Sequence, residues 1–266
     1  MKNTIRFLGI IAFAAIIGFS IAACGGDDDS PGPGPGPDTG PYVPGPDPVP
    51  KITMTTTVSG PTCIYLLGTG SAAIDWGDGD SEEITLTPSD VFNDLWDYDF
   101  SHTYASDAVK TITVTGAVTG FDRNSAGNAS ALNVSGCPGL KFLGCFCEDL
   151  TELDLSKNTA LEWLNCEDNH LSALDLSKNT ILEVLYCDGN QLESLNITGN
   201  TKLDYVECQF NNLGLDALIA VFDSLPPKVS PGDGDVCVSE NPGIYETGYA
   251  AAKAAAEAKY WTVVDY

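Results

Sequence analysis

Basic residues and histidine are scarce in this sequence of 266 residues. It holds 12 Lys and Arg against 37 Asp and Glu, only two His, and a formal net charge of −25. An electrostatic field of this sign repels nucleic acid and anionic lipid headgroups, so the sequence excludes nucleic acid as a partner. With only His102 and His170 present, the sequence offers few candidates for a catalytic triad that contains histidine.

Recognisable catalytic motifs are also missing. The sequence contains no GxSxG, HExxH, P-loop or dinucleotide-binding fingerprint. A pair of carboxylates suited to glycoside hydrolysis remains open among the 37 acids, but no motif selects one. We therefore predict no catalytic residue, no metal centre and no cofactor, and we expect a protein that is not an enzyme.

The N-terminus, residues 1–23, reads as a secretory signal peptide. Lys2 and Arg6 precede an apolar run, residues 7–23, that ends in small residues. A transmembrane helix is the alternative interpretation. The run is short for a membrane span and continues into Gly, Asp and Pro without a basic flank, so the signal peptide is favoured.

Residues 21–24, Ile-Ala-Ala-Cys, resemble the lipobox of bacterial lipoproteins. The resemblance implies that Cys24 is lipidated and becomes the first mature residue. Residues 25–30, GGDDDS, resemble the acidic export signal of Bacteroidota surface lipoproteins, although such a run is also typical of a solvated tether. The expected location is the outer membrane, with a lipid anchor and exposure at the cell surface. Proline and glycine make residues 24–50 an extended tether.

Residues 51–121 are rich in β-branched residues and alternate in polarity, which is typical of strands. Short strands are predicted at residues 51–58, 62–68, 71–79, 82–87 and 110–118. The segments IDWGDGD and SHTYAS, followed by KTITVTG, resemble the PKD domain. That resemblance implies an immunoglobulin-like β-sandwich of the kind found in extracellular proteins.

Two polar features of this region could carry chemistry. His102 is open to a catalytic or metal-binding interpretation, but a structural histidine at the position of the family motif is favoured. Asp75, Asp78 and Asp80 offer the oxygen ligands that Ca²⁺ prefers. Their spacing is not that of an EF-hand loop, so only weak Ca²⁺ binding is expected.

Residues 122–213 repeat with a period of 21 residues. The pattern LxxLxLxxN occurs twice per period, in residues 150–158 and again in residues 161–169. It resembles the leucine-rich repeat, in a nested bacterial form with a 21-residue unit. The first copy is degenerate, with Ala129 and Glu148 where leucine and asparagine are expected. Such coils stack to share a continuous core, so the leucines and asparagines should form ladders along the stack.

Cysteine recurs at one position of every copy. Because that position is apolar and faces inward, the thiols are expected to pack as small hydrophobic groups. Disulfides between neighbouring coils and a zinc site are the alternatives. Zinc is disfavoured because a ladder spreads its sulfurs along a line instead of around a tetrahedron. The cysteines in question are Cys145, Cys166, Cys187 and Cys208.

Residues 214–266 are predicted to cap the repeats. Helical periodicity covers residues 214–226 and an alanine-rich helix covers residues 247–259, with a strand after each. The fold class is therefore mainly β: a PKD-like sandwich at 51–121, a short leucine-rich-repeat solenoid at 122–213 and an α/β cap at 214–266.

The outward side chains of the cysteine-containing halves of the repeats are aromatic and acidic, whereas those of the other halves are small and polar. Contiguous aromatic surface is typical of an interaction site. We predict a cell-surface binding or adhesion protein that recognises a host or bacterial protein or a glycan. An accessory glycan-processing protein or hydrolase, and a structural spacer, are the alternatives. The rings could instead merely cover neighbouring coils or pack against the sandwich. The predicted ligand-binding residues are Phe142, Trp163, Glu167, Tyr186, Tyr205 and Glu207.

Overall fold

The N-terminal part of the fold is a set of antiparallel strands. The structure, a computed structural model, describes residues 49–88, 99–123 and 128–266. The predicted signal peptide, Cys24 and the tether up to residue 48 lie outside these residues. The first strands are β1 (Lys51–Thr56), β2 (Gly60–Asp75), β3 (Ser81–Thr85), β4 (Asp99–Tyr104) and β5 (Lys110–Asp122).

One of these strands differs from the prediction. The segments 62–68 and 71–79 were expected as separate strands, but most of both lies in the single strand β2, which pairs with β3, β4 and β5. The register of β2 against β5 shifts between Leu67 and Gly68 and again between Thr69 and Ala72. Gly70, with φ +75°, lies in that irregular stretch. Glycine here permits a bulge instead of the expected turn, because it adopts positive φ at low cost.

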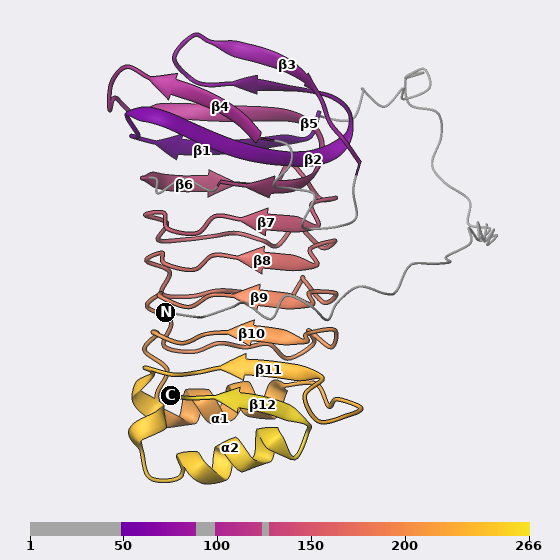
Figure 1. Cartoon of the computed structure of the whole chain (residues 1–266), viewed down its shortest axis with the longest axis vertical. Helices are drawn as coiled ribbons and strands as arrows, with labels where there is room; N and C mark the ends of the chain where they lie inside the picture. Colours follow the sequence, from indigo (N-terminus) through magenta and orange to yellow (C-terminus); the bar gives the residue numbers. More distant parts are fainter. Residues whose placement is uncertain (1–48, 89–98, 124–127) are drawn as a thin grey trace, which may run out of the picture. The chain divides into compact units, whose positions relative to one another are not determined.

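The N-terminal strands and the repeats belong to one mixed sheet. Strand β6 (Ala129–Asn133) pairs antiparallel with β1, and β7 (Phe142–Gly144) pairs parallel with β5. Strands β8 (Trp163–Asn165), β9 (Val184–Tyr186) and β10 (Tyr205–Glu207) follow in parallel order. Figure 1 shows β7 to β10 as successive rungs.

Each rung comes from one repeat, so residues 21 positions apart lie in register. Leu143 pairs with Leu164, and Leu164 with Leu185. These leucines are fully buried, as are the leucines of the other half of each coil, such as Leu155 and Leu176. The parallel strands and shared core agree with the leucine-rich-repeat resemblance.

Two ladders of buried asparagine hold the bends of the coils. In one, the Asn179 side-chain amide donates to the backbone oxygen of Asn158 at 2.8 Å, and Asn200 donates to Asn179 in the same way. In the other, Asn190 donates to the oxygen of Cys166 and accepts from the backbone N–H of Leu171, both at 2.9 Å. Each asparagine therefore satisfies buried backbone groups that the bend would otherwise leave without partners.

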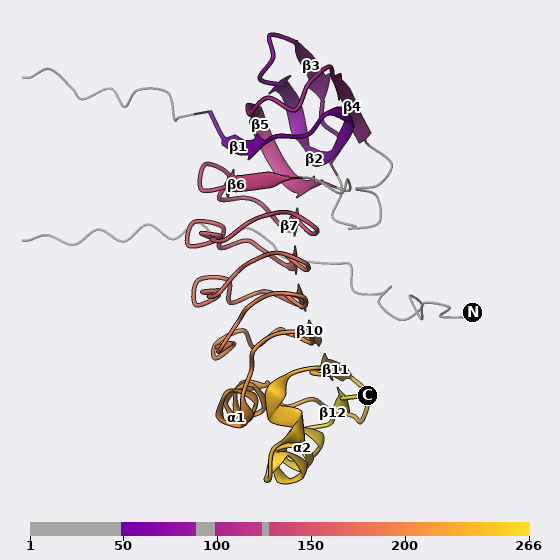
Figure 2. The same ribbon diagram turned by 90° about the vertical axis from the view of Figure 1, so that its left-hand side faces the viewer.

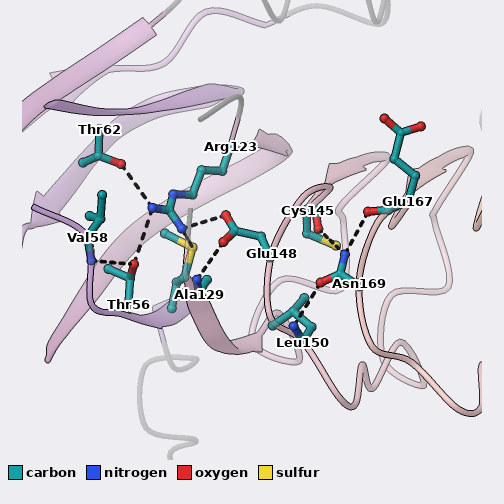
Figure 3. A network of polar contacts seen from close by, with 11 residues as sticks. Thr56, Val58, Thr62, Arg123, Ala129, Cys145, Glu148, Leu150, Glu167 and Asn169 are labelled. Carbon is teal, nitrogen blue, oxygen red and sulfur yellow. Dashed lines mark hydrogen bonds and ion pairs between the residues drawn. The ribbon is translucent and has the colours of Figure 1, made fainter. Parts of the chain in front are cut away.

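The degenerate first copy replaces this asparagine with a buried ion pair (Figure 3). Glu148 Oε2 accepts from the backbone N–H of Ala129 at 2.7 Å, as Asn169 Oδ1 does from Leu150. The carboxylate cannot donate as an amide does. Its other oxygen instead accepts from Arg123 Nη1 at 2.6 Å. Glu148 thus fills the first position of the ladder and ties the repeats to the end of β5.

The coils of β7 to β11 each contain a residue with left-handed backbone conformation, three positions after the last residue of the strand. Positive φ is uncommon for residues other than glycine, yet only one of these positions is glycine. The pattern therefore reflects the path of the coil more than local preference. The residues are Cys147, Asp168, Gly189, Phe210 and Glu240, with φ between 51° and 62°.

The C-terminal residues continue the sheet with two more parallel strands. The elements are α1 (Leu215–Ser224), β11 (Gly234–Cys237), the 3₁₀ helix η2 (Pro242–Tyr245), α2 (Tyr249–Glu257) and β12 (Trp261–Val264). The two predicted helices are confirmed. Figure 2 shows the strands along one side of the coils and α1 on the other.

The second asparagine ladder runs into this region. Asn241 donates to the oxygen of Cys208 at 2.9 Å and accepts from the backbone N–H of Leu213 at 3.0 Å. The predicted cap therefore covers the last 21-residue coil by extending its sheet and its ladder with two longer, helix-containing coils.

Candidate functional site

The strands β8 to β10 direct alternate side chains away from the core. The middle residue of each strand lies in the core, so its two neighbours and the residue two positions further on point away from the core. All of these residues except Asn165 are partly exposed. We call these outward residues the strand face. Its members are Trp163, Asn165, Glu167, Val184, Tyr186, Asp188, Tyr205, Glu207 and Gln209.

Three aromatic rings of the strand face contact one another across adjacent coils. The ring centroids of Trp163 and Tyr186 lie 5.7 Å apart, and those of Tyr186 and Tyr205 lie 5.4 Å apart. All three side chains are half-buried. The structure therefore brings three of the predicted ligand-binding residues into one continuous row.

Phe142 does not join this surface. Its side chain is only 5% exposed and packs against Leu67 of β2, with Tyr65 and Trp163 beside it. The expectation of an exposed ring at this position was wrong, because the N-terminal strands cover the first coil. For Phe142, the alternative interpretation of a ring that packs against the N-terminal region is therefore the correct one.

Three carboxylates accompany the aromatic row. Glu167 and Asp188 occupy the same position in neighbouring coils. The backbone hydrogen bonds show this: the N–H of Cys147 donates to the carbonyl oxygen of Glu167, and one coil further on the N–H of Asp168 donates to that of Asp188. Neighbouring strands lie about 4.8 Å apart, so the two side chains are close neighbours. Glu207 accepts from the Tyr205 hydroxyl through one oxygen and from Gln209 Nε2 at 2.7 Å through the other.

Burial and mutual repulsion perturb these carboxyl groups. Burial first, and then the charges of Glu167 and Glu207, raise the pKa of Asp188 to about 7. Burial, with Asp168 and Glu207 nearby, also raises the pKa of Glu167. Within the described residues neither group forms an ion pair with a basic side chain. When these carboxyl groups are ionised, the strand face carries negative charge that no basic side chain of the described residues pairs with.

Asp122 is an acidic residue beside this face that the sequence analysis did not identify. It ends β5 in register with Gly144, which in turn pairs with Asn165 of the strand face. It is fully buried, and within the described residues neither carboxylate oxygen has a hydrogen-bond partner that meets the distance and angle limits of a hydrogen bond. Burial raises its pKa to about 7. No sequence motif points to Asp122, because its register with the repeats arises only where β5 pairs with β7.

The ladder cysteines lie in the core, as expected. Their exposure is 2% or less, and each thiol points at a carbonyl oxygen of the next coil, at 3.3 to 3.5 Å. The eight cysteines within the described residues are free thiols. Burial raises the pKa of these ladder thiols, so they remain protonated.

A second polar cluster lies in the N-terminal strands. His102 Nε2 lies 2.7 Å from Asp78 Oδ2, and the imidazole stacks on Trp76 with a centroid distance of 5.2 Å. Tyr104 donates its hydroxyl proton to the Trp76 carbonyl oxygen at 2.7 Å. These contacts hold the end of β2 against β4, which agrees with a structural role for His102.

The acidic residues proposed for Ca²⁺ are arranged differently from the expectation. Ligand atoms of Asp78 and Asp80 lie within 4.8 Å of each other and of His102, whereas Asp75 is not part of this group. Asp75 Oδ1 accepts from the backbone N–H of Gly77 at 2.9 Å. Imidazole is a ligand for transition metals more than for Ca²⁺, so this group fits calcium poorly.

The described residues form shallow hollows away from the strand face. One of about 180 Å³ lies between α1 and α2, and another of about 360 Å³ lies beside Asn196 and α1.

In the part of the chain that the structure describes, no helix has the length and apolar character needed to cross a membrane.

Comparison with known proteins gives a distant likeness to a solved structure. No family model matches the chain, and no curated protein matches it. Among solved structures, it is similar to the functional domain of InlJ from Listeria monocytogenes, which is described as including a cysteine ladder. The identity is 20% and the TM-score 0.29. The match covers 51% of this chain and 36% of that one.

Proposed function

We propose that this protein is a non-enzymatic binding or adhesion module that engages its ligand through the strand face. The observation that carries the proposal is the continuous row of Trp163, Tyr186 and Tyr205, flanked by Glu167 and Glu207. Aromatic side chains supply large contact areas at low entropic cost and dominate binding energy at many interfaces. The ligand class is a protein or a glycan.

The rest of the predicted organisation belongs to the same proposal. The N-terminal strands would form a PKD-like sandwich that sets the repeats away from the membrane. Cys24 would be acylated after removal of residues 1–23, anchoring the chain in the outer membrane with the repeats at the cell surface. Stable anchoring by acyl chains requires more than one such chain or a second signal.

The anchor has a direct test. Cells expressing the chain should incorporate radiolabelled palmitate into it, and Cys24→Ala should abolish the labelling. Cys63→Ala serves as the control, because Cys63 lies in β2 of the folded region. Labelling that persists in Cys24→Ala would disprove lipidation at this residue.

The binding proposal is tested with an array of glycans and of host and bacterial proteins, probed with the purified chain. We expect at least one ligand whose signal is lost in Tyr186→Ala and retained in Ser194→Ala, on the small, polar half of the same coil. A ligand that binds both variants as well as wild type would place the site elsewhere, and binding to no ligand would favour a spacer.

A further inference from the structure

We propose that the ligand of the strand face is a cationic polypeptide segment, whose Lys or Arg side chains lie over the rings of Tyr186 and Tyr205 and reach Glu167 and Asp188. The inference rests on the proposed function and specifies the chemistry of its ligand.

Charge is the first reason. Glu167, Asp188 and Glu207 gather on three adjacent coils, and Asp168 lies at the edge of the same surface. Among the described residues none of these four forms an ion pair with a basic side chain of the protein. A cationic ligand would relieve their mutual repulsion, and the net charge of −25 would steer it toward the surface.

Hydrogen-bond acceptors without donors are the second reason. On the strand face, Asp188 Oδ1 and Gln209 Oε1 belong to half-buried side chains and have no hydrogen-bond partner among the described residues. An amide oxygen and the oxygens of an ionised carboxylate accept hydrogen bonds and do not donate them. Ammonium and guanidinium groups carry only donors, so their chemistry complements this surface.

The aromatic row is the third reason. Cations bind the faces of aromatic rings, and the protein uses this contact twice elsewhere. Lys110 Nζ lies 4.5 Å from the ring centroid of Tyr104, and Lys228 Nζ lies 4.8 Å from that of Trp261. In each case the cation belongs to the protein itself. On the strand face the rings of Tyr186 and Tyr205 have carboxylates beside them and no such internal cation in the described part of the chain.

A neutral glycan fits these observations less well. Its hydroxyl groups could stack on the rings and donate to the acceptors, but they would leave the repulsion between Glu167 and Asp188 in place. The strand face extends over several adjacent coils, which suits an extended chain with charges at intervals more than a single sugar unit. Glycan binding is therefore an outcome that the experiment must be able to reveal.

The test is calorimetric titration of the purified chain with a tetra-arginine peptide and with its neutral tetra-citrulline counterpart. The first variant, Glu167→Gln with Asp188→Asn, removes two charges from the strand face. The matched control, Asp154→Asn with Asp175→Asn, removes two charges from the other half of the repeats. Asp154 and Asp175 accept from the backbone N–H groups of Ser156 and Ser177 in their own turns, and Asn196 makes the same hydrogen bond in the next coil.

We expect tetra-arginine to bind and tetra-citrulline not to bind. The strand-face variant should lose at least tenfold in affinity, whereas the control should stay within twofold of wild type. Equal losses in both variants would show that the peptide responds to overall charge, and would overturn the proposal. No binding of tetra-arginine to wild type would also overturn it.

The outcomes separate this proposal from the proposed function. If tetra-arginine fails while an array ligand such as a glycan depends on Tyr186, the face binds but its ligand is not cationic. If no array ligand depends on Tyr186, the proposed function fails too.

Discussion

The inside and the outside of the same strands follow opposite rules. Along the inward column Leu143, Leu164, Leu185 and Val206 are nearly identical and fully buried. Along an outward column of the same strands, glycine, asparagine, tyrosine and glutamate succeed one another. Stacked coils share one core, so the interior must repeat. The outward face has no such constraint, so its differences can encode recognition.

The ends of the second asparagine ladder extend this comparison. At its C-terminal end Asn241 keeps the asparagine, because another parallel coil follows. At its N-terminal end Glu148 replaces it, because the neighbour is Arg123 at the end of an antiparallel region. The buried ladder residue therefore changes from asparagine to glutamate where the neighbouring structure changes from a parallel coil to an antiparallel region.

The substitution with the largest expected effect on stability is at Glu148. Glu148→Ala leaves Arg123, which is fully buried, without its counter-charge, so it should lower the free energy of unfolding by about 3–5 kcal/mol. Urea denaturation measures the change. Asp149→Ala, next to it but exposed, should cost under about 0.5 kcal/mol. Similar small losses for both would mean that the ion pair does not secure the junction.

Within the repeats, the cost should depend on the size of the inward group. Leu164→Ala should lower the free energy of unfolding by about 2–5 kcal/mol, and Cys166→Ala by only about 1 kcal/mol, since less buried apolar volume is removed. The same denaturation series compares them. Stoichiometric zinc in the purified protein, or unfolding on addition of a chelator, would contradict the assignment of Cys166 as a packing residue.

The strand face should show a smaller effect on stability that depends on pH. Because the pKa of Asp188 is raised to about 7, the folded chain holds this proton more tightly than the unfolded chain does. Its contribution to stability therefore falls as pH rises from about 4 to about 7. The charges facing it are Glu167, Glu207 and Asp168.

Asp188→Asn should remove that penalty. We expect a melting temperature a few degrees above wild type at pH 8, and a difference close to zero at about pH 3, where Asp188 is protonated in the folded and in the unfolded chain alike. Differential scanning calorimetry at both pH values measures this. A variant less stable than wild type at pH 8 would contradict the unneutralised charge on which the cationic-ligand proposal rests.

The sequence was most informative where the molecule repeats. The 21-residue period placed the leucine, asparagine and cysteine ladders, and helical periodicity placed α1 and α2, because both signals are local. The burial of Phe142 and the position of Asp122 depend on how the N-terminal strands meet the first coil. No local sequence pattern predicts how these two regions pack. The left-handed residues, such as Asp168 and Phe210, could not be predicted either, because their conformation is set by the path of the coil and they are not glycine.

The central claim is that the strand face binds the ligand, and affinity measured on single substitutions tests it most directly. With a ligand in hand, calorimetry on Trp163→Ala and Tyr186→Ala should show each weakening binding by roughly 2 kcal/mol or more. The fold should survive both changes, because these side chains point away from the core. Affinity within twofold of wild type for both variants would contradict the claim and move the site off the strand face.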